Sequence, residues 1–376
     1  MEKHLNPLSL TRKLISFDTI NPPGQERSCA EYLGKLLEDS GFKTNLYEFA
    51  EGRPSLVARM GPHENKRPIC FSGHIDTVPL GATPWSNDPF SGELHGNRVY
   101  GRGSTDMKAG LAAMVVAAKN LARYSKGKAG ITLVITASEE TGCQGAYHLA
   151  GLENVLGGAG AIVLGEPTSN YPMVGHKGVL WLEARTSGIT AHGSMPEQGV
   201  NAIYKAVKAV TKLQEYDFDV PAHSIMGKST LSVGTISGGS NINSVPDQTI
   251  IGIDIRTIPS QENIDVFEGL KSYLGKEVEL RRVLDLGSVI TDPDDDWIQQ
   301  VFDIMEGVLE KRPVPRALPG FTDASVLRPF FGSPPTIILG PGELTMAHKT
   351  DEFCYTSKIE EATEAYTEIA KKWCNL

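Results

Sequence analysis

Apolar residues in the first part of the chain gather in short runs, and small or charged residues follow each run. These runs are 55–60, 68–71, 131–137 and 159–164. Short apolar runs between turn signals are typical of fully buried strands. Helical patterns alternate with them, at 8–15, 26–40 and 109–123. Alternating strands and helices predict an α/β domain, a sheet covered by helices.

The pattern changes near residue 178. The chain then reads strand, helix, strand, strand, helix and strand, at 180–186, 201–216, 229–236, 249–257, 262–274 and 276–284. This order predicts a small α+β unit of ferredoxin-like type, with both helices on one face of its sheet. Helix and strand patterns resume at 292–310, 336–339 and 357–373. We therefore expect a discontinuous domain of residues 1–177 and 287–376, with residues 178–286 inserted as a second domain.

The composition narrows the classes of partner. The 376 residues carry a formal net charge of −9 and contain no long run of Lys or Arg, which argues against nucleic acid or an anionic membrane as a partner. The first 19 residues lack the apolar core of a signal peptide. No stretch approaches the roughly 18 apolar residues that a membrane span needs. Five scattered cysteines form no C-x-x-C pair, so a disulfide framework is not expected. A cytoplasmic enzyme fits this composition.

The first candidate for chemistry is the sequence His74-Ile75-Asp76, at the end of the apolar run 68–71. On an extended segment the side chains at i and i+2 point the same way. Asp76 can therefore orient the imidazole of His74 toward a metal ion. The same three residues also fit a strand end with a capped turn and a surface histidine. The charged residues farther along the chain favour the metal site.

Those residues follow other predicted strands or stand in the loops beside them: Asp106, Glu139, Glu140 and Glu166. In open α/β sheets the ligand site lies outside the carboxyl ends of the strands. Metal-assisted hydrolysis needs one carboxylate as a ligand and another to accept a proton from water, and Glu139-Glu140 can divide these tasks. With His348 in a late loop, two histidines and several carboxylates suit two zinc-like ions that share a bridging ligand.

Two other chemistries find less support. The pattern Gly101-x-Gly103-x-x-Asp106 is similar to a dinucleotide-binding fingerprint, but it has Asp106 where helix packing requires a small residue. A carboxylate there would also repel a pyrophosphate. The chain contains neither G-x-S-x-G nor H-E-x-x-H, so a serine hydrolase and a helix-borne zinc site lack their motifs.

The motifs at 72–79, 101–108, 139–142 and 165–167, and His348 with Asp351-Glu352 after it, stand in one order. In this order they resemble the M20 metallopeptidase family, particularly its acetylornithine deacetylase/succinyl-diaminopimelate desuccinylase branch. The resemblance extends from residue 17 to residue 353. It implies a zinc-peptidase-like mixed-sheet catalytic domain with an inserted α+β domain that serves as lid and dimerisation surface.

The resemblance also implies the ligands of two Zn²⁺ ions, for which Co²⁺ or Mn²⁺ can substitute. His74 and Glu166 would hold one ion, and Glu140 and His348 the other. Asp106 would bridge the two ions. Of the remaining acids, Asp76 would orient His74 and Glu139 would be the general base.

The inserted domain carries further candidates. The segment 188–196 resembles the family's lid motif, whose histidine, here His192, reaches the partner subunit's active site and stabilises the oxyanion. Segments around Asn243 and Arg256 resemble substrate-binding segments. Arg256 suits a bidentate pair with a substrate carboxylate, and it equally suits a structural ion pair with the nearby Asp254. Lys177 and Thr322 are candidates for the substrate wall, and a homodimer through the inserted domain is expected.

The expected function is a di-zinc amidohydrolase that removes an acetyl or succinyl group from an amino or diamino acid, as in arginine or lysine biosynthesis. The substrate would thus be a small N-acylated amino acid. The loops at 175–178 and 320–324 depart from those of typical desuccinylases and deacetylases, so the acyl group and the amino acid stay open. The alternatives are a carboxypeptidase or dipeptidase with the same metal centre, and a non-catalytic dimeric protein that binds peptides.

Overall fold

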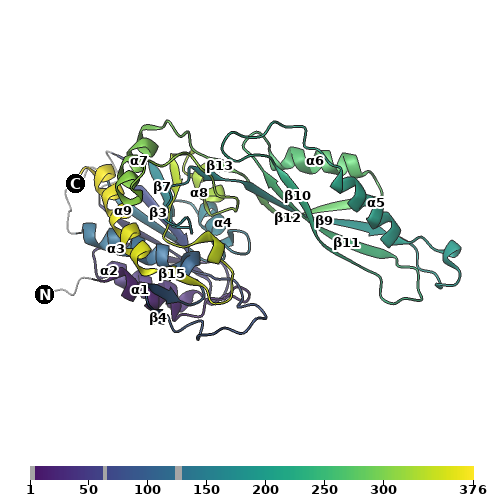
Figure 1. Ribbon diagram of the computed structural model, residues 1–376, viewed down its shortest axis with the longest axis horizontal. Coiled ribbons are helices and arrows are strands. Elements are labelled where there is room, and N and C mark those ends of the chain that lie inside the picture. Colours follow the sequence, from purple (N-terminus) through teal and green to yellow (C-terminus); the bar gives the residue numbers. More distant parts are fainter. Residues whose placement is uncertain (1–4, 62–65, 123–128) are drawn as a thin grey trace. The chain divides into compact units, whose positions relative to one another are not determined.

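The computed structural model describes residues 5–61, 66–122 and 129–376, which fold as two compact units (Figure 1). Residues 176–289 and 319–321 make the second unit, and the rest of the chain makes the first. The divisions at 175/176 and 289/290 lie within three residues of the boundaries expected at 177/178 and 286/287. The short segment 319–321, which the sequence pattern did not separate, belongs to the second unit.

A six-stranded mixed sheet forms the centre of the first unit. Its order is β1 (Lys43–Glu48), β2 (Pro54–Met60), β6 (Ile131–Thr136), β3 (Ile69–His74), β7 (Ala161–Leu164) and β14 (Thr336–Ile338). The last four strands are parallel to one another. Strand β2 is antiparallel to both of its neighbours, β1 and β6. Every residue of β3 and β6 is buried, as expected of a strand covered on both faces. Strand β1 was missed because its side chains are mostly exposed and it has no apolar run.

Seven α-helices belong to the described part of this unit: α1 (Pro7–Ile15), α2 (Arg27–Glu38), α3 (Ala109–Ala122), α4 (Gln144–Gly151), α7 (Asp296–Leu309), α8 (Ala324–Phe330) and α9 (Thr356–Cys374). Helix α3 is apolar around almost its whole circumference, which marks a helix buried on all sides. Arg123, its expected last residue, lies outside the described residues. A Cβ atom at Gly110 would lie 2.1 Å from the carbonyl oxygen of Gly165, so only glycine permits this close approach of α3 to the end of β7.

The parallel register brings the carboxyl ends of three strands to one edge. His74 of β3 pairs with Thr136 of β6, and Ser72 pairs with Leu164 of β7. The segments that follow β6 and β7 therefore begin beside His74. A small sheet of β4 (Leu94–His95), β5 (Arg98–Tyr100) and β15 (Phe353–Tyr355) joins the chain just before residues 101–106 to the chain just after His348.

The second unit is an antiparallel sheet with two helices on one face (Figure 1). The strand order is β10 (Thr230–Gly238), β11 (Gln248–Thr257), β9 (Gly178–Ser187) and β12 (Val278–Leu286). Helices α5 (Ala202–Gln214) and α6 (Asn263–Leu274) pack on the apolar side chains of alternate strand positions. This is the ferredoxin-like arrangement that the sequence predicts, and it confirms the fold class of an α/β domain with an inserted α+β unit. No helix of the described chain has the length and apolar character needed to cross a bilayer.

Candidate metal centre

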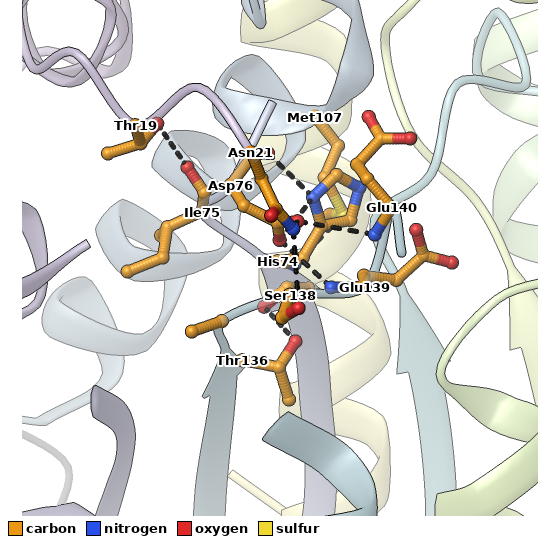
Figure 2. A network of polar contacts seen from close by, with 12 residues as sticks. Thr19, Asn21, His74, Ile75, Asp76, Met107, Thr136, Ser138, Glu139 and Glu140 are labelled. Carbon is orange, nitrogen blue, oxygen red and sulfur yellow. Dashed lines mark hydrogen bonds and ion pairs between the residues drawn. The ribbon is translucent and has the colours of Figure 1, made fainter. Parts of the chain in front are cut away.

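His74 is buried at the end of β3, where Figure 2 shows it beside Asp76, and both of its ring nitrogens have acceptors nearby. Nδ1 lies 3.0 Å from the backbone oxygen of Asp76 and 3.5 Å from its carboxylate. A proton on Nδ1 that is donated to Asp76 leaves Nε2 free to bind a metal. Burial lowers the pKa of His74, but hydrogen bonds with Asp106 and Asp76 outweigh it and raise this pKa well above its usual value.

The Asp76 carboxylate, which is also buried, binds the start of the Glu139-Glu140 loop and the Asn21 side chain (Figure 2). It accepts hydrogen bonds from the backbone N–H groups of Glu139, at 3.0 Å, and Glu140, at 3.2 Å. The Asn21 side chain donates a further bond, at 2.9 Å, and also reaches Ser138. Burial raises the pKa of Asp76, but its partners, His74 first among them, bring it below the usual value. Asp76 thus ties His74 to the glutamate pair.

Asp106 lies between the two histidines. Its Oδ1 is 3.2 Å from Nε2 of His74, and its Oδ2 is 3.4 Å from Nε2 of His348. His348 also lies 3.2 Å from Glu140. Within the described ranges, His74, Asp106 and Glu140 offer ligand atoms that all lie within 4.8 Å of one another. One carboxylate therefore faces both histidines with different oxygens, which is the geometry of a bridging ligand.

Glu166 follows β7, and its Oε2 lies 3.8 Å from Nε2 of His74. Burial, and then the charges of neighbouring acids such as Asp106, raise the pKa of Glu166 well above its usual value, while His74 opposes the rise. Burial and the same kind of repulsion raise the pKa of Glu139 well above the usual range and that of Glu140 to about 7. Carboxylates crowded in this way repel one another unless cations neutralise them.

The donor set fits divalent metal ions. Imidazole nitrogens and carboxylate oxygens are the ligands that zinc takes at catalytic sites, and Co²⁺ and Mn²⁺ accept the same donors. The pKa of His348 is raised to about 10, mainly by hydrogen bonds to Asp106 and Glu140. All five predicted ligands lie at this edge of the sheet.

The remaining candidates of the first unit lie beside this edge. Thr322 is fully buried, and its hydroxyl accepts the backbone N–H of Ala324 at the start of α8. Asp323, also buried, accepts a hydrogen bond from Thr136, and burial raises its pKa to about 6. Sequence reasoning missed Asn21 as a site residue. The only signal for Asn21 was its place before two prolines and a glycine, which indicates a turn and not a contact.

The second unit holds the other predicted residues. His192 is exposed, and its Nδ1 lies 2.8 Å from the hydroxyl of Ser194. The backbone oxygen of Asn243 accepts the N–H of Gly193, so the loops of His192 and Asn243 lie together.

The two predicted substrate-binding cations of this unit, Lys177 and Arg256, have partners of their own. Lys177 donates to the backbone oxygen of Lys228, and burial with the nearby Arg256 lowers the pKa of Lys177. Arg256 pairs with Asp254 at 3.1 Å. The ion pair considered as an alternative for Arg256 is therefore present.

A mixed sheet with a buried histidine and facing carboxylates at the carboxyl ends of its strands defines a metallohydrolase of α/β type. The profile of Peptidase family M20/M25/M40 matches residues 70–372, and the chain belongs to this family. The predicted resemblance and the assignment as a metal-dependent hydrolase are thereby confirmed.

The relatives and structural neighbours extend over nearly the whole chain. A probable succinyl-diaminopimelate desuccinylase of Staphylococcus epidermidis is 30% identical over 97% of each chain. An acetylornithine deacetylase of Vibrio atlanticus is 30% identical over 98% of each chain. An M20 family metallo-carboxypeptidase from Sulfolobus solfataricus has a similar fold, with a TM-score of 0.82, 20% identity, and coverage of 98% of this chain and 99% of the other. A dinuclear metal-binding M20 peptidase of Bacillus subtilis has a TM-score of 0.72, 16% identity and 98% coverage of both chains.

Proposed function

We propose that the chain is a dinuclear amidohydrolase that removes an acyl group, acetyl or succinyl, from the nitrogen of an amino or diamino acid. The observation that carries this proposal is the position of Asp106, with one oxygen near His74 and the other near His348. The relatives at 30% identity, which are named a desuccinylase and an acetylornithine deacetylase, support the choice of substrate class.

In this proposal His74 and Glu166 would hold one metal ion, Glu140 and His348 would hold the other, and Asp106 would be a ligand of both. Zinc is the proposed metal, and Co²⁺ or Mn²⁺ can replace it. When bound, the ions supply Lewis acidity that activates water and polarises the amide carbonyl. Asp76 keeps His74 and the Glu139-Glu140 backbone in place through the hydrogen bonds described above.

Glu139 is the proposed general base. Its backbone N–H is held by Asp76, and among the described residues no hydrogen bond engages its carboxylate. It is adjacent in sequence to Glu140, whose carboxylate belongs to the cluster of closely spaced ligand atoms. These features support the proposal that the Glu139 carboxylate accepts a proton from the attacking water and returns that proton to the leaving amine.

Most of the proposed substrate contacts are residues of the second unit, and Thr322 belongs to the first unit. Asp254 binds Nε of Arg256, and within the described chain the two terminal nitrogens of Arg256 have no hydrogen-bonding partner. That fork can bind a substrate carboxylate with two parallel hydrogen bonds. His192 is proposed to stabilise the oxyanion in the site of a partner subunit, in a homodimer formed through this unit. Asn243, Lys177 and Thr322 complete the proposed substrate wall.

A carboxypeptidase or dipeptidase is the second candidate, because the neighbour with a TM-score of 0.82 is an M20 metallo-carboxypeptidase. Both reactions cleave an amide with the same metal centre, and they differ in what lies on each side of the bond. A non-catalytic peptide-binding protein is the third candidate. The presence of Glu139 beside all five proposed ligands argues against it.

The test is one zinc-loaded sample assayed against N-acetylornithine, N-succinyl-diaminopimelate, other N-acyl amino acids and a set of dipeptides, with Glu139→Ala as the blank. Release of acetate or succinate from an N-acyl amino acid, at a rate at least tenfold above any dipeptide, is the expected result. Faster dipeptide cleavage would replace the proposal with the peptidase. Hydrolysis of none of these compounds would favour the binding protein.

A further inference from the structure

A buried carboxylate outside the proposed metal ligands connects two of the loops that carry them. Glu352 is 1% exposed and follows His348 by four residues. Its Oε1 accepts the backbone N–H groups of Thr105, at 2.7 Å, and Asp106, at 3.0 Å. Its Oε2 accepts the N–H of Gly103 at 3.1 Å. Three backbone amides, at Asp106 and within the three residues before it, thus bind one side chain.

Arg102 supplies the countercharge and adds a third segment. It is 1% exposed, and its Nη1 donates to Glu352 at 2.6 Å and to the backbone oxygen of Lys349 at 3.3 Å. Nη2 donates to the backbone oxygen of Pro79, at 3.0 Å, in the segment that follows His74-Ile75-Asp76. The ring of Trp85 covers the guanidinium at 5.1 Å, and Nε has no partner among the described residues. The pair therefore joins the chain after His74, the chain before Asp106 and the chain after His348.

We infer that Glu352, supported by Arg102, is a positioning residue that fixes the direction of the Asp106 carboxylate between His74 and His348. The inference rests on the proposed role of Asp106 as the metal bridge. Burying two charges carries a large desolvation cost, and packed apolar residues often stabilise a fold as well as such a pair does. Stability alone therefore explains this pair poorly. The hydrogen bonds that Glu352 makes to the backbone of a ligand loop point to control of ligand geometry.

The decisive variant is Glu352→Gln, which keeps the shape of the side chain but turns one acceptor oxygen into an N–H₂ donor. Either the Thr105 and Asp106 amides or the Gly103 amide and Arg102 then face another donor. We expect the affinity for Zn²⁺ to fall 10- to 100-fold, the usual effect of removing a partner that orients metal ligands. In the proposed reaction kcat should fall while KM changes less than about threefold, because Glu352 does not touch substrate. Excess zinc should restore part of the lost kcat.

Glu26→Gln is the matched control. Glu26 is fully buried in the same unit and binds Arg53 through Nε and Nη2, and among the described residues no hydrogen bond or ion pair joins its carboxylate to a ligand loop. We expect both variants to lower the melting temperature of the metal-free protein, and only Glu352→Gln to lower zinc affinity, measured by competition with a chromophoric chelator.

Wild-type zinc affinity in folded Glu352→Gln, or an equal loss of affinity in both variants, would overturn the inference. If Glu352→Gln does not fold, Arg102→Lys takes its place: it keeps the charge but loses the fork that reaches Glu352 and Pro79, and the same selective loss of zinc affinity is expected. Failure of the wild-type chain to bind zinc would refute the proposed metal centre itself. Zinc binding without hydrolysis would refute only the proposed reaction.

Discussion

In the first unit most candidate residues are buried or half-buried near the ends of strands, with His348 exposed in a late loop, whereas in the second unit they lie in exposed loops and on the open face of a sheet. Asp76 accepts two backbone amides and an asparagine side chain, and it sits beside a fully covered strand. The contacts of His192 within the described chain are with the neighbouring Ser194 and Met195 and through a short pairing with the loop of Ser244. The first arrangement is rigid and suits metal ligands, which tolerate little displacement. The second leaves side chains free for partners that come from outside the unit.

The largest effect on turnover should follow a substitution at the carboxyl ends of the strands in the first unit that leaves the proposed metal ligands unchanged. We expect Glu139→Ala to keep both zinc ions but lose turnover about 10⁴-fold, the upper range for removal of a general base. Steady-state kinetics and elemental analysis on the same sample measure the two quantities. Full turnover with zinc bound would remove Glu139 from the role of base.

A second experiment tests whether the exposed loop of the second unit takes part in chemistry. His192→Ala should lower kcat by about 10²- to 10³-fold, the usual loss for one oxyanion donor, with the fold unchanged by circular dichroism. His95→Ala, an exposed histidine of the first unit, is the control and should leave kcat unchanged.

Hybrid dimers sharpen this result. If His192 acts in the partner's site, mixing Glu139→Ala chains with His192→Ala chains creates one site with both residues intact, and activity should reappear. Continued inactivity of a verified hybrid dimer would place His192 in its own subunit's site or outside the mechanism.

Metal removal should lower the thermal stability of the first unit. The facing carboxylates repel one another without cations, so a chelator should lower the melting temperature. Metal at about 100 times its Kd stabilises a fold by roughly 2.7 kcal/mol. For a unit of this size that corresponds to roughly 5–10 °C. Differential scanning fluorimetry measures the shift, and Asp106→Ala should show none. An equal shift in that variant would indicate metal bound elsewhere.

The smallest effect should come from the open sheet face of the second unit. Arg256→Lys keeps the charge but removes the guanidinium fork, and KM for the proposed substrate should rise about tenfold with kcat nearly constant. Arg281→Lys is the control, because Arg281 lies on β12 and pairs with Glu183. Equal kinetics in both variants would assign Arg256 to a structural pair with Asp254.

Sequence patterns predicted the architecture well where burial is one-sided or complete. The buried runs of β3 and β6 and the order of elements in the second unit are visible in the sequence because apolar residues at fixed spacing record which face is covered. The sequences of strand β1 and of helices α4 and α8 show no such spacing of apolar residues. Strand β1 is mostly exposed, and the two helices are short.

The sequence by itself determined the residue types available for chemistry, their order and the strand ends that carry them. Only the tertiary structure decided which backbone groups hold them. The backbone oxygen of Asp76 lies closer to His74 than its carboxylate does, and Asn21 reaches Asp76 across 55 positions of the chain. Glu352 reaches the amide of Asp106 across 246 positions. Hydrogen bonds to backbone amides leave no trace in local composition, because every residue but proline offers the same donor.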